Sequence, residues 1–317
     1  MIQLICLFAV AVLVVVRVPH AFTSEAARPA WWATASGVVA LTTYGIPVPF
    51  TTYDLFLGSS NITTLVRDLA AVSAFWFFRE ALARRAGSVG RFGSRWGLAV
   101  ISAVCVVSFL LIQNKGTTDV AFITNRLDQT FVWIYGSAYM ASLIWISLSA
   151  ILLAAKNWRG VQMTFIIGFT SVIIGCVLEI GYLTASHFGY GGQSFRYLAW
   201  NTSELPFFLG LLIIMAGVAW IAIVTPSRRR ILVSKLHHIA QQNELSQHGP
   251  ENLGVVRRLF SEKKMLARAS ELVRLLDKAQ RHGNFHPSSR ETYIIGQVKQ
   301  FLTPDPEFSP MVLGKAA

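Results

Sequence analysis

Seven stretches of mostly apolar residues follow one another along the chain, with short polar segments between them. A helix rises 1.5 Å per residue and needs about 20 apolar residues to cross the hydrocarbon core of a bilayer. We therefore predict an all-α protein with seven transmembrane helices, of which the first is the shortest. These helices are expected near residues 2–16, 30–46, 62–78, 96–112, 130–155, 162–186 and 205–225.

Basic residues fall mainly in alternate connections between these stretches, which predicts the orientation of the bundle. The connections after the first, third and fifth stretches carry nine lysines and arginines, whereas those on the opposite side carry three. Cytoplasmic loops of membrane proteins carry the excess of positive charge. Since Arg228, Arg229 and Arg230 continue the basic side, we predict an outer N-terminus and a cytoplasmic C-terminus in a bacterial plasma membrane.

The composition supports this class. Hydrophobic residues make up 53% of the 317 positions and charged residues only 14%, whereas about a quarter of a soluble domain is charged. The net charge of +12 is concentrated on the predicted cytoplasmic side, so it does not by itself indicate nucleic acid binding. Cys6, Cys105 and Cys176 lie inside apolar stretches and are expected to be small buried residues rather than disulfide partners.

Ionisable residues inside the predicted spans are the candidate functional groups, because a charge in the bilayer core is costly and normally faces the protein interior. All of them lie in the outer half of the bundle, and Glu179 is the deepest. Helical spacing places Glu179 on one face with small residues that mark close helix contact. The ligand-binding or ion-pair candidates are Arg67, Asp68, Glu179, Glu204, Tyr135, Tyr139 and Tyr182.

We expect an ion pair between Arg67 and Glu179, with Glu204 or Asp68 nearby, because buried charges are normally compensated. Tyr135 and Tyr139 begin a polar face on the fifth span, and together these groups could line a cavity open to the outside. The alternative is a purely structural role, in which an ion pair and interhelical hydrogen bonds set the packing.

The chain lacks the residues that several classes of protein need for their activity. The seventh span has no lysine for a retinal Schiff base, and no phosphate-binding, metalloprotease or nucleophile-elbow motif occurs. We therefore predict no catalytic residues, cofactor or metal site. His237 and His238 are expected to be solvated residues on a helix face rather than phosphoacceptors.

A separate cytoplasmic module is predicted from residue 227 onward, because 15 basic and 8 acidic residues fall in the last 91 positions. Helices are expected over residues 230–245 and 255–280, and a third follows the capping box formed by Ser288 and Glu291. Residues 304–317 are expected to be disordered. The helical domain at 227–303 is predicted to bind a cytoplasmic protein or anionic lipid headgroups, in preference to nucleic acid.

One short motif resembles a known family. Pro47, Val48, Pro49 and Phe50 lead into Asp54-x-x-Leu57-Gly58-x-x-Asn61 before the third span. This arrangement is similar to a family of actinobacterial seven-helix membrane proteins that carry an uncharacterised cytoplasmic C-terminal domain. Its members are often labelled as transporters without an established substrate. Many of them have a histidine in the third span where this chain has Asp68, so the resemblance implies fold and lineage more than a shared activity.

Two functional hypotheses follow from these patterns. The first is a non-enzymatic sensor or regulatory protein, whose outer cavity receives a stimulus that the tail relays to a cytoplasmic partner. The second is a transporter or proton-coupled permease that uses Glu179 and Arg67. No internal repeat or matched pair of broken spans favours the transporter.

Overall fold

The computed structural model describes residues 2–23, 27–45, 48–86, 95–157, 160–243, 262–283 and 285–302. Regular structure in these ranges is helical throughout, so the predicted all-α class is confirmed. The chain divides into two units, Met1–Ala219 and Trp220–Ala317. The predicted disordered segment 304–317 lies outside the described residues.

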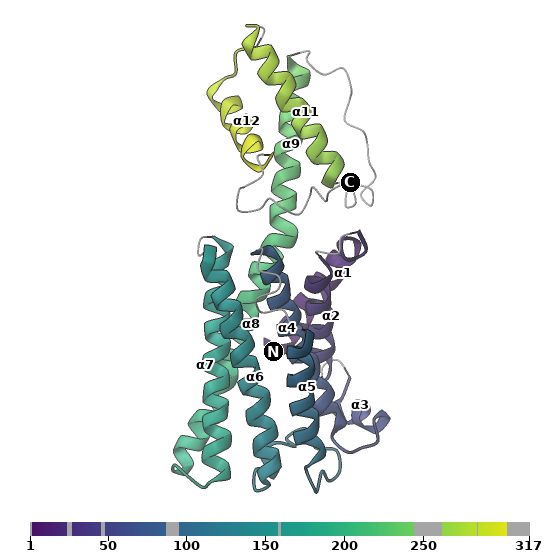
Figure 1. Cartoon of the computed structure of the whole chain (residues 1–317), viewed down its shortest axis with the longest axis vertical. Helices are drawn as coiled ribbons and strands as arrows, with labels where there is room; N and C mark the ends of the chain where they lie inside the picture. The colour runs from purple at the N-terminus through teal and green to yellow at the C-terminus, as the bar shows by residue number, and fades with distance from the viewer. Residues whose placement is uncertain are drawn as a thin grey trace. The chain divides into compact units, whose positions relative to one another are not determined.

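The first unit is a bundle of long helices that run alongside one another (Figure 1). The long helices are α1 (Ile2–Thr23), α2 (Arg28–Thr42), α4 (Ile62–Arg85), α5 (Arg95–Leu110), α6 (Thr130–Ala154), α7 (Val161–His187) and α8 (Gln193–Ala219). A short helix, α3 (Phe50–Phe56), precedes α4. The last of these long helices begins earlier than predicted, at Gln193 rather than near Leu205, so Pro206 lies inside α8.

The helices of the bundle pack in a closed order. Helix α1 packs against α2, α2 against α4, α4 against α6, α6 against α7, α7 against α8, and α8 returns to α1. Helix α5 packs outside this ring against α4 and α6. Helix α4 is the best shielded, since each residue from 62 to 84 is buried or half-buried. The central position of α4 explains how it carries charged side chains in an apolar bundle.

Three helical stretches in the described part of the chain are long and apolar enough to cross a membrane: Thr130–Ala154, Val161–His187 and Thr202–Gln242. Two shorter apolar helices, Ile2–Val18 and Trp96–Leu110, accompany them. By length and composition, the chain is therefore a multi-pass membrane protein in contact with lipid.

Helices α7 and α8 approach closely because small residues line both sides of their contact, as the sequence predicted for α7. A Cβ atom added at Gly175 would lie 2.8 Å from the backbone nitrogen of Phe207 and 2.9 Å from the carbonyl oxygen of Ser203. At Gly210 it would lie 2.6 Å from the carbonyl oxygen of Gly168. Ser171 Oγ also donates a 2.7 Å hydrogen bond to the carbonyl oxygen of Pro206. Larger side chains at these positions would force the two helices apart.

The second unit contains the three helices that the sequence predicted: α9 (Thr225–Gln242), α11 (Glu262–Arg281) and α12 (Ser289–Leu302). A separate hydrophobic core joins them. Its fully buried side chains include Leu236 from α9, Leu276 from α11 and Val298 from α12. Residues 255–261, which were predicted to begin the second tail helix, lie outside the described residues.

The predicted capping box at the start of α12 is confirmed. The backbone nitrogen and the hydroxyl of Ser288 each donate a 2.7 Å hydrogen bond to Glu291 Oε2. The backbone nitrogen of Glu291 in turn donates to Ser288 Oγ at 3.4 Å. These bonds from Ser288 favour the ionised carboxylate and lower the pKa of Glu291. The box therefore fixes where the third helix of the second unit begins.

Candidate functional site

A polar cavity of about 370 Å³ lies at the end of the bundle where α4 and α6 begin and α7 ends, which we call the cavity end. Charged side chains from three helices line it: Arg67 and Asp68 from α4, Glu179 from α7 and Glu204 from α8. The prediction that these four groups share one end of the bundle agrees with this arrangement. Ligand sites of this size are typically concave and carry a few convergent polar groups.

Asp68 is the centre of the hydrogen bonding on α4. Its side chain is 1% exposed, and Arg67 Nε donates to Asp68 Oδ1 at 3.0 Å. On the other oxygen, Tyr135 Oη donates to Asp68 Oδ2 at 2.7 Å. The Arg67 guanidinium also lies over the ring of Tyr44, 4.9 Å from its centroid. Asp68 therefore compensates the charge of Arg67 and ties α4 to α6.

The structure differs from the sequence prediction in the partner of Glu179. Glu179 Oε2 accepts a 2.7 Å hydrogen bond from Ser203 Oγ of α8, and Arg67 pairs with Asp68 instead. The predicted Arg67 to Glu179 ion pair is therefore wrong within the described part of the chain. The reason is geometric, since Asp68 is next to Arg67 in sequence and already occupies its Nε. Glu179 and the exposed Glu204 remain as carboxylates that face the same cavity.

The predicted tyrosines have three different environments. Tyr135 is fully buried on Asp68, Tyr139 lines the polar cavity, and Tyr182 is buried in α7 but does not line that cavity. Ser142 and Ser149, further along α6, donate to carbonyl oxygens of their own helix. Sequence reasoning also missed Tyr44, because it lies at the end of the second span without a charged neighbour in sequence.

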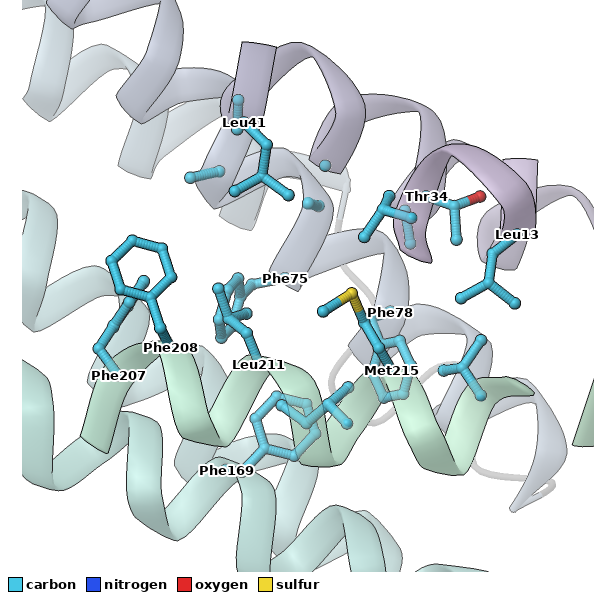
Figure 2. Close-up of a pocket in the computed structure, with 18 of the residues that line it drawn as sticks. Leu13, Thr34, Leu41, Phe75, Phe78, Phe169, Phe207, Phe208, Leu211 and Met215 are labelled. Carbon is cyan, nitrogen blue, oxygen red and sulfur yellow. The ribbon is translucent and has the colours of Figure 1, made fainter. Parts of the chain in front are cut away.

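A second, apolar cavity of about 110 Å³ lies inside the bundle (Figure 2). Its walls come from α1, α2, α4, α6, α7 and α8, and Phe75, Phe169 and Leu211 are among the side chains that surround it. Thr34 Oγ1 donates a 2.8 Å hydrogen bond to the carbonyl oxygen of Trp31, so its hydroxyl is already satisfied. The cavity is therefore suited to an apolar group.

Loops at the cavity end are held by a hydrogen-bond network that we call the loop latch, made of Asp54, Asn61, Thr118 and the backbone of 115–119. Asp54 Oδ2 accepts from Thr118 Oγ1 at 2.6 Å and from the backbone nitrogen of Asn61 at 3.0 Å. Asp54 Oδ1 accepts from the backbone nitrogen of Thr63 at 3.1 Å, which satisfies a free amide at the start of α4. Asp54 thus caps α4 from outside the helix.

Asn61 completes the loop latch from a left-handed backbone conformation, with φ of 58°. Its Nδ2 donates to the carbonyl oxygens of Lys115 and Thr117 at 2.8 and 3.0 Å, and its Oδ1 accepts from the backbone nitrogen of Asp119 at 2.8 Å. The Asp54-x-x-Leu57-Gly58-x-x-Asn61 motif therefore has a structural basis, because both of its polar ends belong to one network. Burial acts to raise the pKa of Asp54, but the hydrogen bonds from Thr118, Thr63 and Asn61 outweigh it and lower that pKa.

We expect Asp54→Asn to loosen the cavity end, because an amide presents one acceptor oxygen where the carboxylate presents two. Hydrogen bonds to a charged group contribute about 1.5 to 3 kcal/mol each, so the loss should exceed that of an ordinary loop substitution. Hydrogen exchange measured by mass spectrometry should speed up in peptides that cover 50–64 and 113–120. Thr51→Ala, at an exposed position of α3, is the matched control and should leave both peptides unchanged.

The tail contains a buried histidine that the sequence analysis placed in solvent. His237 is 8% exposed, and neither of its ring nitrogens has a hydrogen-bond partner among the described residues. His238 is exposed as predicted. The prediction failed for His237 because this face of α9 packs into the core of the second unit.

A basic groove of about 750 Å³, which we call the tail groove, runs along α11 and α12. Arg274, Lys278 and Arg281 line it from α11, and Lys299 lines it from α12. Lys299 Nζ lies 2.8 Å from Asp277 Oδ1, so one of these cations is paired within the groove. The remaining positive charge makes the tail groove suitable for an acidic partner.

The polar cavity offers charged and hydroxyl groups that can hold a ligand. Its groups are carboxylates, one guanidinium and hydroxyls, and the described residues contain no cluster of three histidine, cysteine or acidic side chains placed to hold a metal ion. The cysteines Cys6, Cys105 and Cys176 are free and buried, in agreement with the sequence prediction. Comparisons with protein-family models, with curated proteins and with solved structures found no match for this chain.

Proposed function

We propose that the chain is a seven-span membrane sensor with an outer N-terminus and a cytoplasmic tail. Three observations beyond the three longest apolar helices support seven spans. The shorter helices α1, α2, α4 and α5 pack in the same bundle as α6, α7 and α8, so one solvent should surround all of them. Charged side chains lower the mean hydropathy of α4, but the neighbouring helices shield α4 along its length.

The surfaces of α1 and α5 also support membrane spans. Each presents large apolar side chains to the outside at helical spacing, as expected for helices that face lipid. On α1 the exposed residues are Leu4, Phe8, Val12 and Val15, and on α5 they are Trp96, Val100, Val104 and Val107. In water, two such apolar stripes on one molecule would strongly promote aggregation.

The observation that carries the sensor proposal is the pairing of a polar cavity with a separately folded tail. The cavity collects four ionisable groups at one end of the bundle, and the second unit has its own core and a basic groove. In the proposed orientation, the cavity faces outward and the tail faces the cytoplasm. A solute that binds at the cavity would shift the bundle between two states, and the tail groove would pass the change to an acidic cytoplasmic partner.

Crosslinking with mass spectrometry on native membranes tests this proposal. The full-length protein should capture a cytoplasmic protein that is not captured by a chain ending at Arg230, although both insert into the membrane. The double variant Arg274→Glu and Lys278→Glu should lose the same partner, because it reverses charge in the tail groove at exposed positions. Identical partners with and without residues 231–317 would contradict the sensor.

A transporter or proton-coupled permease is the second candidate, and Pro206 inside α8 favours it. Proline removes a backbone hydrogen bond within a helix, and interrupted helices surround the substrate sites of many transporters. Pro206 lies close in sequence to Ser203, the hydrogen-bond partner of Glu179. In proteoliposomes with a pH-sensitive dye, Glu179→Gln should then abolish proton flux at normal protein levels. Unchanged flux would count against this candidate.

The resemblance to actinobacterial seven-helix proteins remains part of the proposal. The loop latch supports this resemblance, because Asp54 and Asn61 of the motif lie in one hydrogen-bond network at the N-terminus of α4. A motif with this role would preserve the shape of the cavity end without specifying a ligand. The resemblance therefore agrees with the proposed architecture and leaves the choice between sensor and transporter to experiment.

A further inference from the structure

The polar and apolar cavities share a set of aromatic side chains in their walls. Tyr44, Tyr139, Phe207 and Phe208 line both of them. One molecule could therefore place a polar group in the first cavity and an apolar group in the second, with these four rings around the junction. A purely polar solute would leave the apolar cavity unfilled.

The charges of the polar cavity indicate the sign of the polar group. Arg67 is the one cation among its described lining residues, and Asp68 already compensates it at 3.0 Å. Glu179 and Glu204 add two carboxylates, of which Glu179 has Ser203 as a hydrogen-bond donor. An ionised carboxylate at membrane depth, such as that of Glu179, is stabilised by an accompanying cation. A positively charged ligand would supply that cation, and the aromatic rings at the junction also suit an ammonium group.

The size of the apolar cavity limits the apolar group. Its volume of about 110 Å³ is somewhat smaller than the ~150 Å³ cavity that accepts benzene in an engineered protein core. A short alkyl chain or a single ring fits this space better than a whole lipid chain. Phe75, Phe78 and Met215 provide the apolar surface that such a group would contact (Figure 2).

We propose that the two adjoining cavities together bind a small amphipathic ammonium ion, with its charged group beside Glu179 and Glu204 and its apolar group in the inner cavity. This inference rests on the proposed function, for which it names the class of ligand. The same class would serve as the stimulus of a sensor or as the substrate of a transporter.

Titration calorimetry on the full-length protein in lipid nanodiscs tests the inference with three probes of similar shape. These are 2-phenylethylammonium, the neutral 2-phenylethanol and the anionic 3-phenylpropanoate, each corrected with empty nanodiscs. The ammonium ion should bind at least about tenfold more tightly than either analogue. The double variant Glu179→Gln and Glu204→Gln should remove that preference.

A second pair of variants tests the apolar end. Ala71→Met places a flexible side chain in the inner cavity and should weaken binding of the ammonium probe severalfold. Val104→Met, on the exposed face of α5, is the matched control and should have no effect. If Ala71→Met binds normally, the inner cavity does not hold the apolar group and the inference is overturned.

If the double variant fails to fold, the affinities of the three probes for the unsubstituted protein still test the inference. Equal affinities, or tighter binding of the anion, would overturn the assignment to a cation while leaving a solute-binding cavity in place. Binding of none of them would overturn the inference as a whole. The crosslinking experiment tests the sensor proposal separately, because capture of a partner by the tail does not depend on which solute occupies the cavity.

Discussion

Asp68→Asn should be among the most damaging single substitutions in the bundle, lowering its stability by about 3 to 5 kcal/mol. The substitution leaves the Arg67 guanidinium without its carboxylate partner. Because the Arg67 side chain is only 15% exposed, water cannot fully replace that partner. The substitution also replaces the charged acceptor of Tyr135 with a neutral one. Scanning fluorimetry in nanodiscs should therefore show a large drop in the unfolding midpoint, together with reduced membrane levels.

Two further variants separate loss of the ion pair from general damage to α4. Glu80→Gln breaks a partly exposed i,i+4 pair on the same helix, where Arg84 Nε lies 3.2 Å from Glu80 Oε1. Such pairs contribute about 0.3 to 0.5 kcal/mol, so this control should have a much smaller effect. Combining Asp68→Asn with Arg67→Gln removes the stranded charge and should recover part of the stability. A midpoint unchanged in Asp68→Asn would refute the structural role of this pair.

Gly175→Ala should also destabilise the bundle, by about 1 to 3 kcal/mol, because its new methyl group would lie within 3 Å of the backbone of α8. The nearest atoms are the Cβ and backbone nitrogen of Phe207 and the carbonyl oxygen of Ser203, none of which can rotate away. The helices must therefore separate, which should also weaken the hydrogen bond from Ser203 to Glu179. The unfolding midpoint should fall, and binding of any cavity ligand should weaken with it.

Gly181→Ala on the same helix is the matched control for this effect. A Cβ atom added at Gly181 has no neighbour within 4 Å. Alanine is intrinsically favoured over glycine in a helix by about 1 kcal/mol, so Gly181→Ala should be neutral or mildly stabilising. If both substitutions lower the unfolding midpoint equally, the effect of Gly175→Ala does not come from the close contact between α7 and α8.

The helices and the location of the charged groups were predictable because each depends on residues close together in sequence. Helical periodicity placed Glu179 on the same face as Gly175, and the structure confirms that this face packs against α8. The capping box at Ser288 was predictable for the same reason, since its two residues are three positions apart. The number of membrane spans stays a prediction beyond the three longest apolar helices.

Other features depend on contacts between distant segments and could not be predicted. The loop latch joins Asp54 to Thr118, which are 64 positions apart, and no periodic pattern connects them. Ser203 as the partner of Glu179, and Tyr44 as a wall of both cavities, depend on the order in which the helices pack. The apolar cavity exists because side chains from six helices fail to fill the space between them, and packing at that level is not encoded in local spacing.

The central claim is that the cavity end and the tail lie on opposite sides of the membrane, and labelling of single cysteines in intact cells tests it most directly. The native cysteines are buried, so the background should be low. Gln113→Cys, at an exposed position of the loop after α5, should react with a membrane-impermeant maleimide in intact cells. Glu271→Cys, exposed on α11, should react only after permeabilisation. Labelling of both positions in intact cells, or of neither, would place them on the same side and contradict the proposed sensor.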